Sequence, residues 1–176
     1  MKRLLLLRHA KSLRDDAIKD RERPLNARGR ADAPRMGIFM HHEQWMPDLV
    51  LSSPSARTLE TWELLSPELG ATGSMKKVDA LYLAGDNAIA KTIKAVEDSV
   101  STLLVIGHNP GLEDCAKRLM REPQSAKERD RAAKLEEKFP TCTLAVLDFE
   151  IEDWNGLADH AGALTAFVRP KDLPQG

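Results

Sequence analysis

Apolar runs of strand length alternate along the chain with segments of helical period. The first run, residues 2–7 (KRLLLL), is followed by strand-like runs at 48–53 and 101–108 and by a weaker one at about 75–82. The leucines of the first run occupy consecutive positions, which is typical of a strand that is covered on both faces. These runs therefore predict the buried strands of a sheet.

The segments between the runs carry helical period and candidate capping residues. Asn26 predicts the start of a helix that reaches about His42. Pro34 and Gly37 lie within this helix and weaken the prediction, because both residue types destabilise helix interiors. Ser55 is a candidate cap for the next helix, whose apolar positions recur at helical spacing: Leu59, Trp62, Leu65 and Leu69.

Three further helices are expected in the second half of the chain. We expect Asp86 to cap a helix that carries its apolar residues on one face: Ile89, Ile93 and Val96. Another helix (NPGLEDCAKRLM) should be capped near Asn109. The charge-rich segment 121–138 is typical of a surface helix with ion pairs between residues four apart.

Successive strand–helix units favour a parallel sheet with helices on both faces. The two closing runs, 141–150 and 162–170, are joined by a short connection without a long helix, so we expect them to pair antiparallel. The pattern predicts an α/β fold: a three-layer α/β/α sandwich with a mostly parallel sheet and an antiparallel edge. Residues 1–176 are expected to form a single domain.

Charge and composition narrow the functional class. Lys and Arg number 26 and Asp and Glu 27, so the formal net charge is −1, which argues against a general nucleic-acid binder. The run LLLL is far too short for a signal sequence or a membrane span. We therefore expect a cytoplasmic protein with neither nucleic acid nor membrane as a partner.

The cysteines and the paired histidines suggest no metal or disulfide. Cys115 and Cys142 are widely spaced and form no C-x-x-C, so they are expected to be reduced, semi-buried thiols. His41 and His42 are adjacent on a predicted helix and cannot face the same way, so we expect both to be exposed.

Basic and imidazole side chains stand where predicted strands end. Arg8 and His9 end the first strand, Arg57 lies in the first turn of the helix after the second, and His108 ends the 101–108 run. Ligand sites of parallel α/β sheets gather beyond the carboxyl ends of the strands. Guanidinium forks, imidazoles and the amides of a helix N-terminus together predict an anion site, and arginine suits phosphate best.

Each of these features also has a plainer explanation. An Arg-His pair usually lies on the surface, and an arginine in a first helical turn is usually solvated. His108 could be a core histidine bonded to a loop carbonyl. A metal site is disfavoured because no carboxylate or third histidine stands at ligand spacing, and the glycine-rich loops that cradle nucleotides are absent from the sequence.

Several motifs resemble one family throughout the chain. LLLLRHAKS is similar to the Arg-His-Gly signature of the histidine phosphatase superfamily, with Ala10 where many members have glycine. RPLNARGRADAPRMG, PDLVLSSPSARTLET, LLVIGHNPGLE, KFPT and FVRPKDL resemble its small phosphohistidine-phosphatase branch, the SixA type. The resemblance runs in order from residue 3 to about residue 173 and implies a phosphoglycerate mutase-like fold.

The resemblance also implies roles for individual residues. His9 would accept the phosphoryl group, while Arg8, Arg57 and His108 would bind it. No metal or organic cofactor would be needed, and the substrate would be a phosphorylated protein, with a histidine phosphotransfer domain as the expected partner. Lys11 and Ser12 lie close in sequence and either contact the phosphate or only shape the loop, and the sequence leaves both options open.

The residues themselves account for part of this chemistry. His9 must be neutral to attack phosphorus, and we expect the neighbouring Arg8 and Arg57 to disfavour its protonation by repulsion between like charges. Attack would form a phospho-His9 intermediate that water then hydrolyses.

A second set of residues concerns the leaving group. Metabolic members of the superfamily carry a glutamate after the third strand that acts as a general acid, and this chain has Tyr82 or Leu83 at that place. Asp79 and Asp86 are the nearest carboxylates, and Asp86 is explained more simply as a cap.

The charged segment 14–23 is interpreted as a solvated loop.

Two alternative functions stay open. The first is a small-molecule phosphomonoesterase of the same superfamily, which is disfavoured because the predicted loops are mostly short and offer no long insertion that would form a lid over a metabolite. The second is a phosphohistidine-binding module without catalysis. An intact His9 beside both arginines argues against the second, because a binding module needs the arginines and not the nucleophile.

Overall fold

The computed structural model describes residues 1–70 and 73–175. The described part of the chain contains a six-stranded sheet with the strand order β3-β2-β4-β1-β5-β6. Strands β3, β2, β4 and β1 are parallel, and β5 runs antiparallel to both β1 and β6. The strands are β1 (Lys2–Arg8), β2 (Leu49–Ser52), β3 (Ser74–Lys77), β4 (Thr102–Gly107), β5 (Leu144–Phe149) and β6 (Ala163–Val168). The antiparallel pairing of the last two strands is confirmed.

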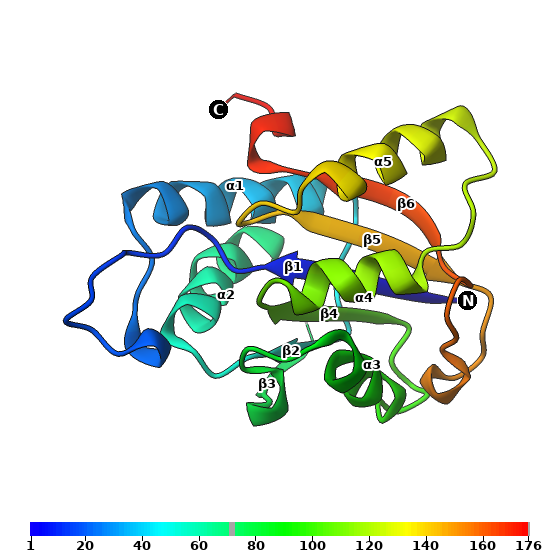
Figure 1. Cartoon of the computed structure of the whole chain (residues 1–176), viewed down its shortest axis with the longest axis horizontal. Helices are drawn as coiled ribbons and strands as arrows, with labels where there is room; N and C mark the ends of the chain where they lie inside the picture. Colours follow the sequence, from blue (N-terminus) through cyan, green and yellow to red (C-terminus); the bar gives the residue numbers. More distant parts are fainter. Residues whose placement is uncertain (71–72, 176) are drawn as a thin grey trace.

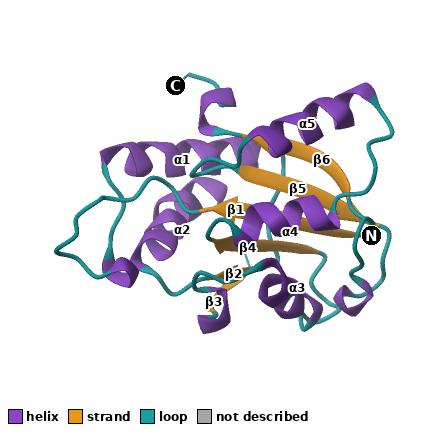
Figure 2. Ribbon diagram, in the orientation of Figure 1, coloured by secondary structure: helices purple, strands orange, loops and turns teal. Residues whose placement is uncertain are grey.

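Helices bound the sheet on both sides (Figure 2). They are α1 (Ala27–His42), α2 (Ala56–Leu69), α3 (Asp86–Lys94), α4 (Gly111–Leu119) and α5 (Ala126–Glu137). Short 3-10 turns occupy Asp20–Glu22, Asp79–Leu81, Trp154–Gly156 and Pro170–Asp172. No described helix is long and apolar enough to span a membrane.

The leucine run of β1 supplies both cores of the molecule. Leu4 and Leu6 pack into the cluster on the α3, α4 and α5 face, whereas Leu5 and Leu7 pack into the cluster on the α1 and α2 face. All four side chains are fully buried. Side chains alternate across a strand, so a strand that is apolar at every position is stable only between two covered faces. The three-layer α/β/α arrangement with a mostly parallel sheet is therefore confirmed.

The caps predicted for the first two helices are present. Asn26 Oδ1 accepts the Gly29 N–H at 2.9 Å, and Ser55 Oγ accepts the Thr58 N–H at 3.4 Å. Each bond satisfies one of the backbone N–H groups that a helix start leaves without an intrahelical partner. Helix α1 continues through Pro34, because packing against α2 outweighs the weak propensity.

The later boundaries differ from the sequence prediction. The cap of α3 is Gly85 and not Asp86, whose carboxylate instead accepts from Arg118 at 3.1 Å. The expected strand at 75–82 is wrong beyond Lys77, because the chain turns there into a 3-10 helix. Helix α3 ends at Lys94, so Val96 only packs beside the core from outside the helix.

Two smaller expectations also need correction. Pro110 occupies the cap position of α4, although the Asn109 side chain still accepts the Glu113 N–H at 3.3 Å. Cys115 and Cys142 are free thiols, as expected, but both are fully buried and not semi-buried.

Helices α1 and α2 approach each other closely at Gly37. A Cβ atom at this position would lie 2.5 Å from the Leu65 carbonyl oxygen, which is shorter than any real contact. Glycine is therefore required here by packing, although it lowers intrinsic helix propensity. The same contact holds α2, which carries Arg57, against the rest of its layer.

We predict that Gly37→Ala destabilises the protein by about 1–3 kcal/mol, the range expected for overpacking. Helix propensity alone would predict the opposite sign. Urea unfolding of the variant measures the change in the free energy of unfolding. Gly156→Ala is the matched control, because its Cβ would meet only ordinary contacts of 3.6 Å. Equal or greater stability of Gly37→Ala would contradict the close approach.

Candidate active site

The parallel strands β1, β2 and β4 end at the same edge of the sheet, beside the loop that follows β1 (Figure 1). A cavity of about 260 Å³ lies at these ends. Arg8, His9, Arg57 and His108 all line it. The other lining residues are Lys11, Ser12, Arg14, Asp20, Arg23, Leu83, Asn109 and Thr141. The topology thus brings together every residue that the sequence analysis selected for an anion site.

The geometry of His9 defines which nitrogen can react. Its side chain is buried, and Nδ1 lies 2.7 Å from the Ala10 carbonyl oxygen. A carbonyl oxygen only accepts hydrogen bonds, so Nδ1 carries the proton and Nε2 keeps its lone pair. The His9 and His108 ring centroids are 5.4 Å apart. His9 therefore offers a nucleophilic nitrogen beside the other cavity groups.

Burial keeps the imidazole of His9 neutral. Loss of solvent lowers its pKa to about 3, against a smaller opposing effect of the Ala10 carbonyl. His108, Arg57 and Arg8 make smaller contributions to the same lowering of the pKa, in that order of size. The sequence analysis attributed neutrality to repulsion by Arg8 and Arg57, so the larger cause was missed. Burial could not be deduced from the position of His9 at a strand end.

His108 is held by Ser53, which directly follows β2, and by Arg57 of α2. Its Nε2 lies 2.8 Å from Ser53 Oγ, and its Nδ1 lies 3.4 Å from Arg57 Nη2. Arginine only donates, so Nδ1 accepts and Nε2–H donates to Ser53. Burial first, and then Arg57, lower the pKa of His108 to about 4. The plainer explanation, a core histidine bonded to a loop carbonyl, does not describe this environment.

Arg57 is buried, and its guanidinium group donates hydrogen bonds to several partners. Its Nη1 donates to the Asp20 backbone oxygen at 2.7 Å, and its Nη2 donates to Asp20 Oδ2 at 3.2 Å. The side chain is 4% exposed, so it is not the solvated arginine that its first-turn position could have produced. The ion pair with Asp20 fixes the guanidinium at the cavity wall.

Arg8 is positioned from the opposite side. Its Nη1 donates to the Phe139 carbonyl at 3.0 Å, and Asn109 Nδ2 donates to the same oxygen at 3.0 Å. Among the described residues, the buried Nε–H of Arg8 has no acceptor. Buried donors are almost always satisfied, so this group points to an anion as its missing partner.

Lys11 and Ser12 both line the cavity, and both also shape the loop. The Lys11 carbonyl accepts the Asn26 N–H at 2.9 Å, and Ser12 Oγ accepts from Arg23 at 3.3 Å. A Cβ at Gly29 would lie 2.2 Å from the Lys11 carbonyl, so the start of α1 packs directly on this backbone. The loop is thereby held rigidly beside His9.

The sequence analysis missed several residues that line the site or hold its side chains. Ser53 orients His108, and Asp20, Arg14 and Arg23 belong to the segment that was interpreted as a solvated loop. Most of residues 14–23 are exposed, as that interpretation expects, but Asp20 also binds Arg57. Ser53 could have been suspected from its place at a strand end, whereas a charged run carries no signal that selects Asp20.

Neither carboxylate proposed as an acid lines the cavity. Asp79 is exposed and lies 3.4 Å from Arg21, and Asp86 lies 3.1 Å from Arg118. Within residues 1–70 and 73–175, no group of three or more His, Cys, Asp and Glu side chains is arranged to hold a metal ion.

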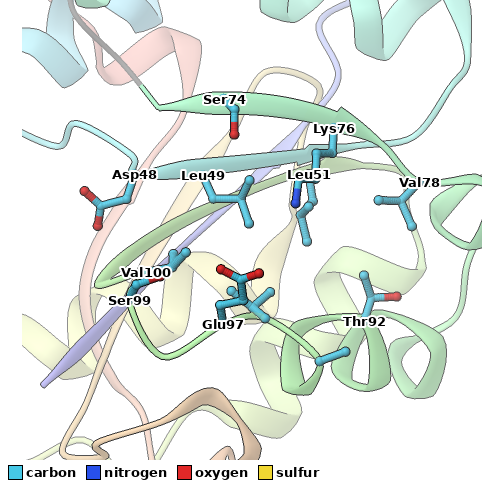
Figure 3. Close-up of a pocket in the computed structure, with 12 residues that line it drawn as sticks. Asp48, Leu49, Leu51, Ser74, Lys76, Val78, Thr92, Glu97, Ser99 and Val100 are labelled. Carbon is cyan, nitrogen blue, oxygen red and sulfur yellow. The ribbon is translucent and has the colours of Figure 1, made fainter.

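A larger hollow of about 400 Å³ lies beside β2, β3 and the end of α3 (Figure 3). Leu49 and Leu51 line it. The Asp48 carboxylate at its rim accepts the backbone N–H groups of Ser101 and Thr102 at 2.9 and 2.8 Å. Asp48 therefore has a structural role, and the hollow lacks the imidazole and arginine groups of the smaller cavity.

Comparison with known proteins places the chain in a family. The sequence profile of the histidine phosphatase superfamily (branch 1) matches residues 4–81. An uncharacterised protein of Mycobacterium tuberculosis is 32% identical over 165 residues, which cover 94% of this chain and 100% of the relative.

Solved structures agree with this assignment. A protein of Nakamurella multipartitia with a provisional SixA phosphohistidine phosphatase name is 28% identical, with a TM-score of 0.82 and coverage of 96% of both chains. A similarly named protein of Agrobacterium tumefaciens is also 28% identical, with a TM-score of 0.78 and coverage of 96% of this chain and 98% of that one. The fold is phosphoglycerate mutase-like. The chain belongs to the histidine phosphatase superfamily and is of the SixA type.

We predict that the imidazoles of His9 and His108 stay neutral from pH 8 down to pH 5, because burial lowers their pKa values to about 3 and about 4. Nitrogen-15 NMR of the imidazoles measures this and also assigns the tautomers. His9 should carry its proton on Nδ1. A cationic His9 at pH 6 would contradict the structure.

The same shifts predict a pH dependence of stability. Histidines of the unfolded chain bind protons below about pH 6.5, while folded His9 and His108 do not. The free energy of unfolding should therefore decrease as the pH falls from about 6.5 towards 4. His9→Gln should weaken this dependence, and urea titrations at several pH values would measure it.

Proposed function

We propose that this protein is a metal-independent phosphohistidine phosphatase that removes phosphate from a phosphorylated protein through a phospho-His9 intermediate. One observation carries the proposal: the Nε2 lone pair of His9 lies in a cavity whose other walls hold Arg57, His108 and the buried, unsatisfied Nε–H of Arg8. Such a cavity supplies a nucleophile and donors for a phosphoryl group together. The superfamily and its SixA-type relatives support the coarser class of phosphatase.

The first step would transfer the phosphoryl group to the protein. His9 Nε2 attacks phosphorus in line with the leaving nitrogen, and the new P–N bond forms as the old one breaks. The substrate ring, which takes a proton from solvent on its other nitrogen, departs as a neutral imidazole. Arg8 and Arg57 hold the equatorial oxygens, where negative charge is greatest in the transition state. The Ala10 carbonyl accepts from Nδ1–H and so stabilises the charge that the ring acquires.

The second step would release phosphate. Water attacks the phosphorus of phospho-His9, the P–N bond breaks, and His9 becomes neutral again. Neutral His108 accepts from Arg57 Nη2 through Nδ1 at 3.4 Å and so helps to hold the guanidinium beside the phosphate. Division of one difficult displacement into two easier ones is the general advantage of a covalent intermediate.

The environment of the cavity supports a histidine-linked phosphate as the substrate group. A departing imidazole needs less protonation than an alkoxide, and Asp79 and Asp86 both lie away from the cavity. We propose a histidine phosphotransfer domain as the substrate and the cytoplasm as the location. The alternatives are a small-molecule phosphomonoesterase and a non-catalytic phosphohistidine-binding module.

We predict that His9→Ala abolishes turnover of a phosphohistidine protein, because it removes the nucleophile. Mass spectrometry of the wild-type protein quenched during turnover should detect phosphate on His9. His42→Ala is the matched control, because His42 is an exposed histidine on α1 with a side chain that is 86% exposed. Circular dichroism and urea unfolding should show that His9→Ala stays folded. Turnover at the wild-type rate in His9→Ala would exclude the covalent route.

A further prediction concerns Arg57. Arg57→Lys should reduce kcat/KM by about 10²–10³-fold, the effect of removing one preorganised donor from a transition state. A lysine ammonium cannot reproduce the planar fork that reaches both Asp20 and the phosphate. Steady-state kinetics on the same phosphohistidine protein measure this loss. A binding module without catalysis would instead bind phosphohistidine and show no turnover in any variant.

A further inference from the structure

The only carboxylate that lines the phosphate cavity among the described residues is Asp20. Its Oδ1 accepts from Arg23 at 2.7 Å. Its Oδ2 accepts from Arg57 at 3.2 Å and also from the hydroxyl of Tyr82. Both oxygens are therefore engaged as acceptors from donors on three different side chains. A protonated carboxyl group could not accept all of these hydrogen bonds, so the contacts keep Asp20 as a carboxylate.

The electrostatics agree with this geometry. The hydrogen bonds from Tyr82 and Arg23, followed by the charge of Arg57, hold the pKa of Asp20 far below its usual range. The bond to Asp20 raises the pKa of the Tyr82 hydroxyl, so the phenol is also a poor proton donor. Asp20 has no proton to give at neutral pH, and the Tyr82 hydroxyl donates its proton to Asp20 and does not line the cavity.

The histidines of the cavity also carry no extra proton that they could give to a leaving group in the free protein. Burial lowers the pKa of His9 to about 3 and that of His108 to about 4, so both are neutral near pH 7. His9 is also the proposed nucleophile, and its remaining proton on Nδ1 is directed to the Ala10 carbonyl. The cavity is consequently rich in groups that bind a phosphoryl group and poor in groups that protonate what leaves it.

A site of this kind selects substrates by the leaving group. Carboxylic acids have an ordinary pKa of about 4, imidazolium about 6.5 and phenols about 10. Carboxylates therefore depart readily without a proton, whereas phenolates and alkoxides depart slowly. We propose that the cavity also hydrolyses acyl phosphates, the mixed anhydrides of a carboxylic acid and phosphoric acid, because Asp20 is locked by Arg23, Arg57 and Tyr82. This inference rests on the proposed phospho-His9 route.

The reaction balances without any further reactant except water. His9 Nε2 forms a bond to phosphorus, the P–O bond to the acyl group breaks, and the carboxylate leaves with the electron pair and needs no proton. Water then forms a bond to phosphorus, the P–N bond of phospho-His9 breaks, and inorganic phosphate leaves. The electron pair of the broken P–N bond returns to Nε2, and the proton lost by water passes to phosphate or solvent.

The first experiment compares acetyl phosphate, phenyl phosphate and glycerol 3-phosphate with the wild-type protein, using His9→Ala as the background. We expect acetyl phosphate to be hydrolysed and to label His9 covalently. We expect kcat/KM for glycerol 3-phosphate to be lower by ~10²-fold or more, since a general acid typically contributes ~10²–10⁴-fold to such a reaction. Values within tenfold of each other across the three compounds would overturn the inference.

The second experiment tests Asp20 directly. Under the proposal, Asp20→Asn reduces kcat/KM for acetyl phosphate and for phenyl phosphate by the same factor, because Asp20 acts only through Arg57. A fall for phenyl phosphate that is at least tenfold larger would show that Asp20 donates a proton and would overturn the proposal. Asp16→Asn is the matched control, since Asp16 is exposed on the same loop and outside the lining of the cavity.

The outcomes separate this inference from the proposed function. Turnover of a phosphohistidine protein with phospho-His9 formation, but without hydrolysis of acetyl phosphate, would overturn the acyl phosphate activity alone. Failure to turn over both substrates would overturn the two proposals together. Hydrolysis of acetyl phosphate through His9 without phosphohistidine turnover would support the proposed acyl phosphate activity and reject the phosphohistidine function.

Discussion

Strand β1 is apolar at consecutive positions and is therefore stable only when both of its faces are covered. This constraint places β1 in the interior of the sheet, between β4 and β5, with a core on each side. The next residues, Arg8 and His9, are consequently delivered to a partly enclosed edge and not to open solvent. His9 is buried at this edge, and burial is the main cause of its low pKa.

The cavity depends on three elements that meet at this edge. The end of β1 supplies the proposed nucleophile, the start of α2 supplies Arg57, and the end of β4 supplies His108. Their relative positions are set by the parallel register of the sheet and by the close contact of α1 with α2 at Gly37. Rigid scaffolding of this kind is what electrostatic preorganisation requires, because the charged groups then need no rearrangement during the reaction.

The loop after β1 has a second role beyond surface solvation. Asp20 reaches back to Arg57 with both its backbone oxygen and its carboxylate, and Tyr82 completes the group. This arrangement orients the arginine and at the same time removes the carboxylate as a source of protons. One ion pair thus links the binding of the phosphoryl group to the choice of leaving group that the proposed chemistry allows.

The sequence by itself determined the layered α/β fold, the starts of α1 and α2 and the convergence of Arg8, His9, Arg57 and His108, because apolar periodicity, capping residues and strand ends are local patterns. It misplaced the cap of α3 and overextended β3, since Gly85 and the turn after Lys77 are set by neighbouring contacts. Only the tertiary structure decided that Asp20 and Ser53 belong to the site. Asp20 and Ser53 act through partners 37 and 55 positions away in the chain. The strand end gives a local signal for Ser53 only, and neither contact is encoded by a local pattern.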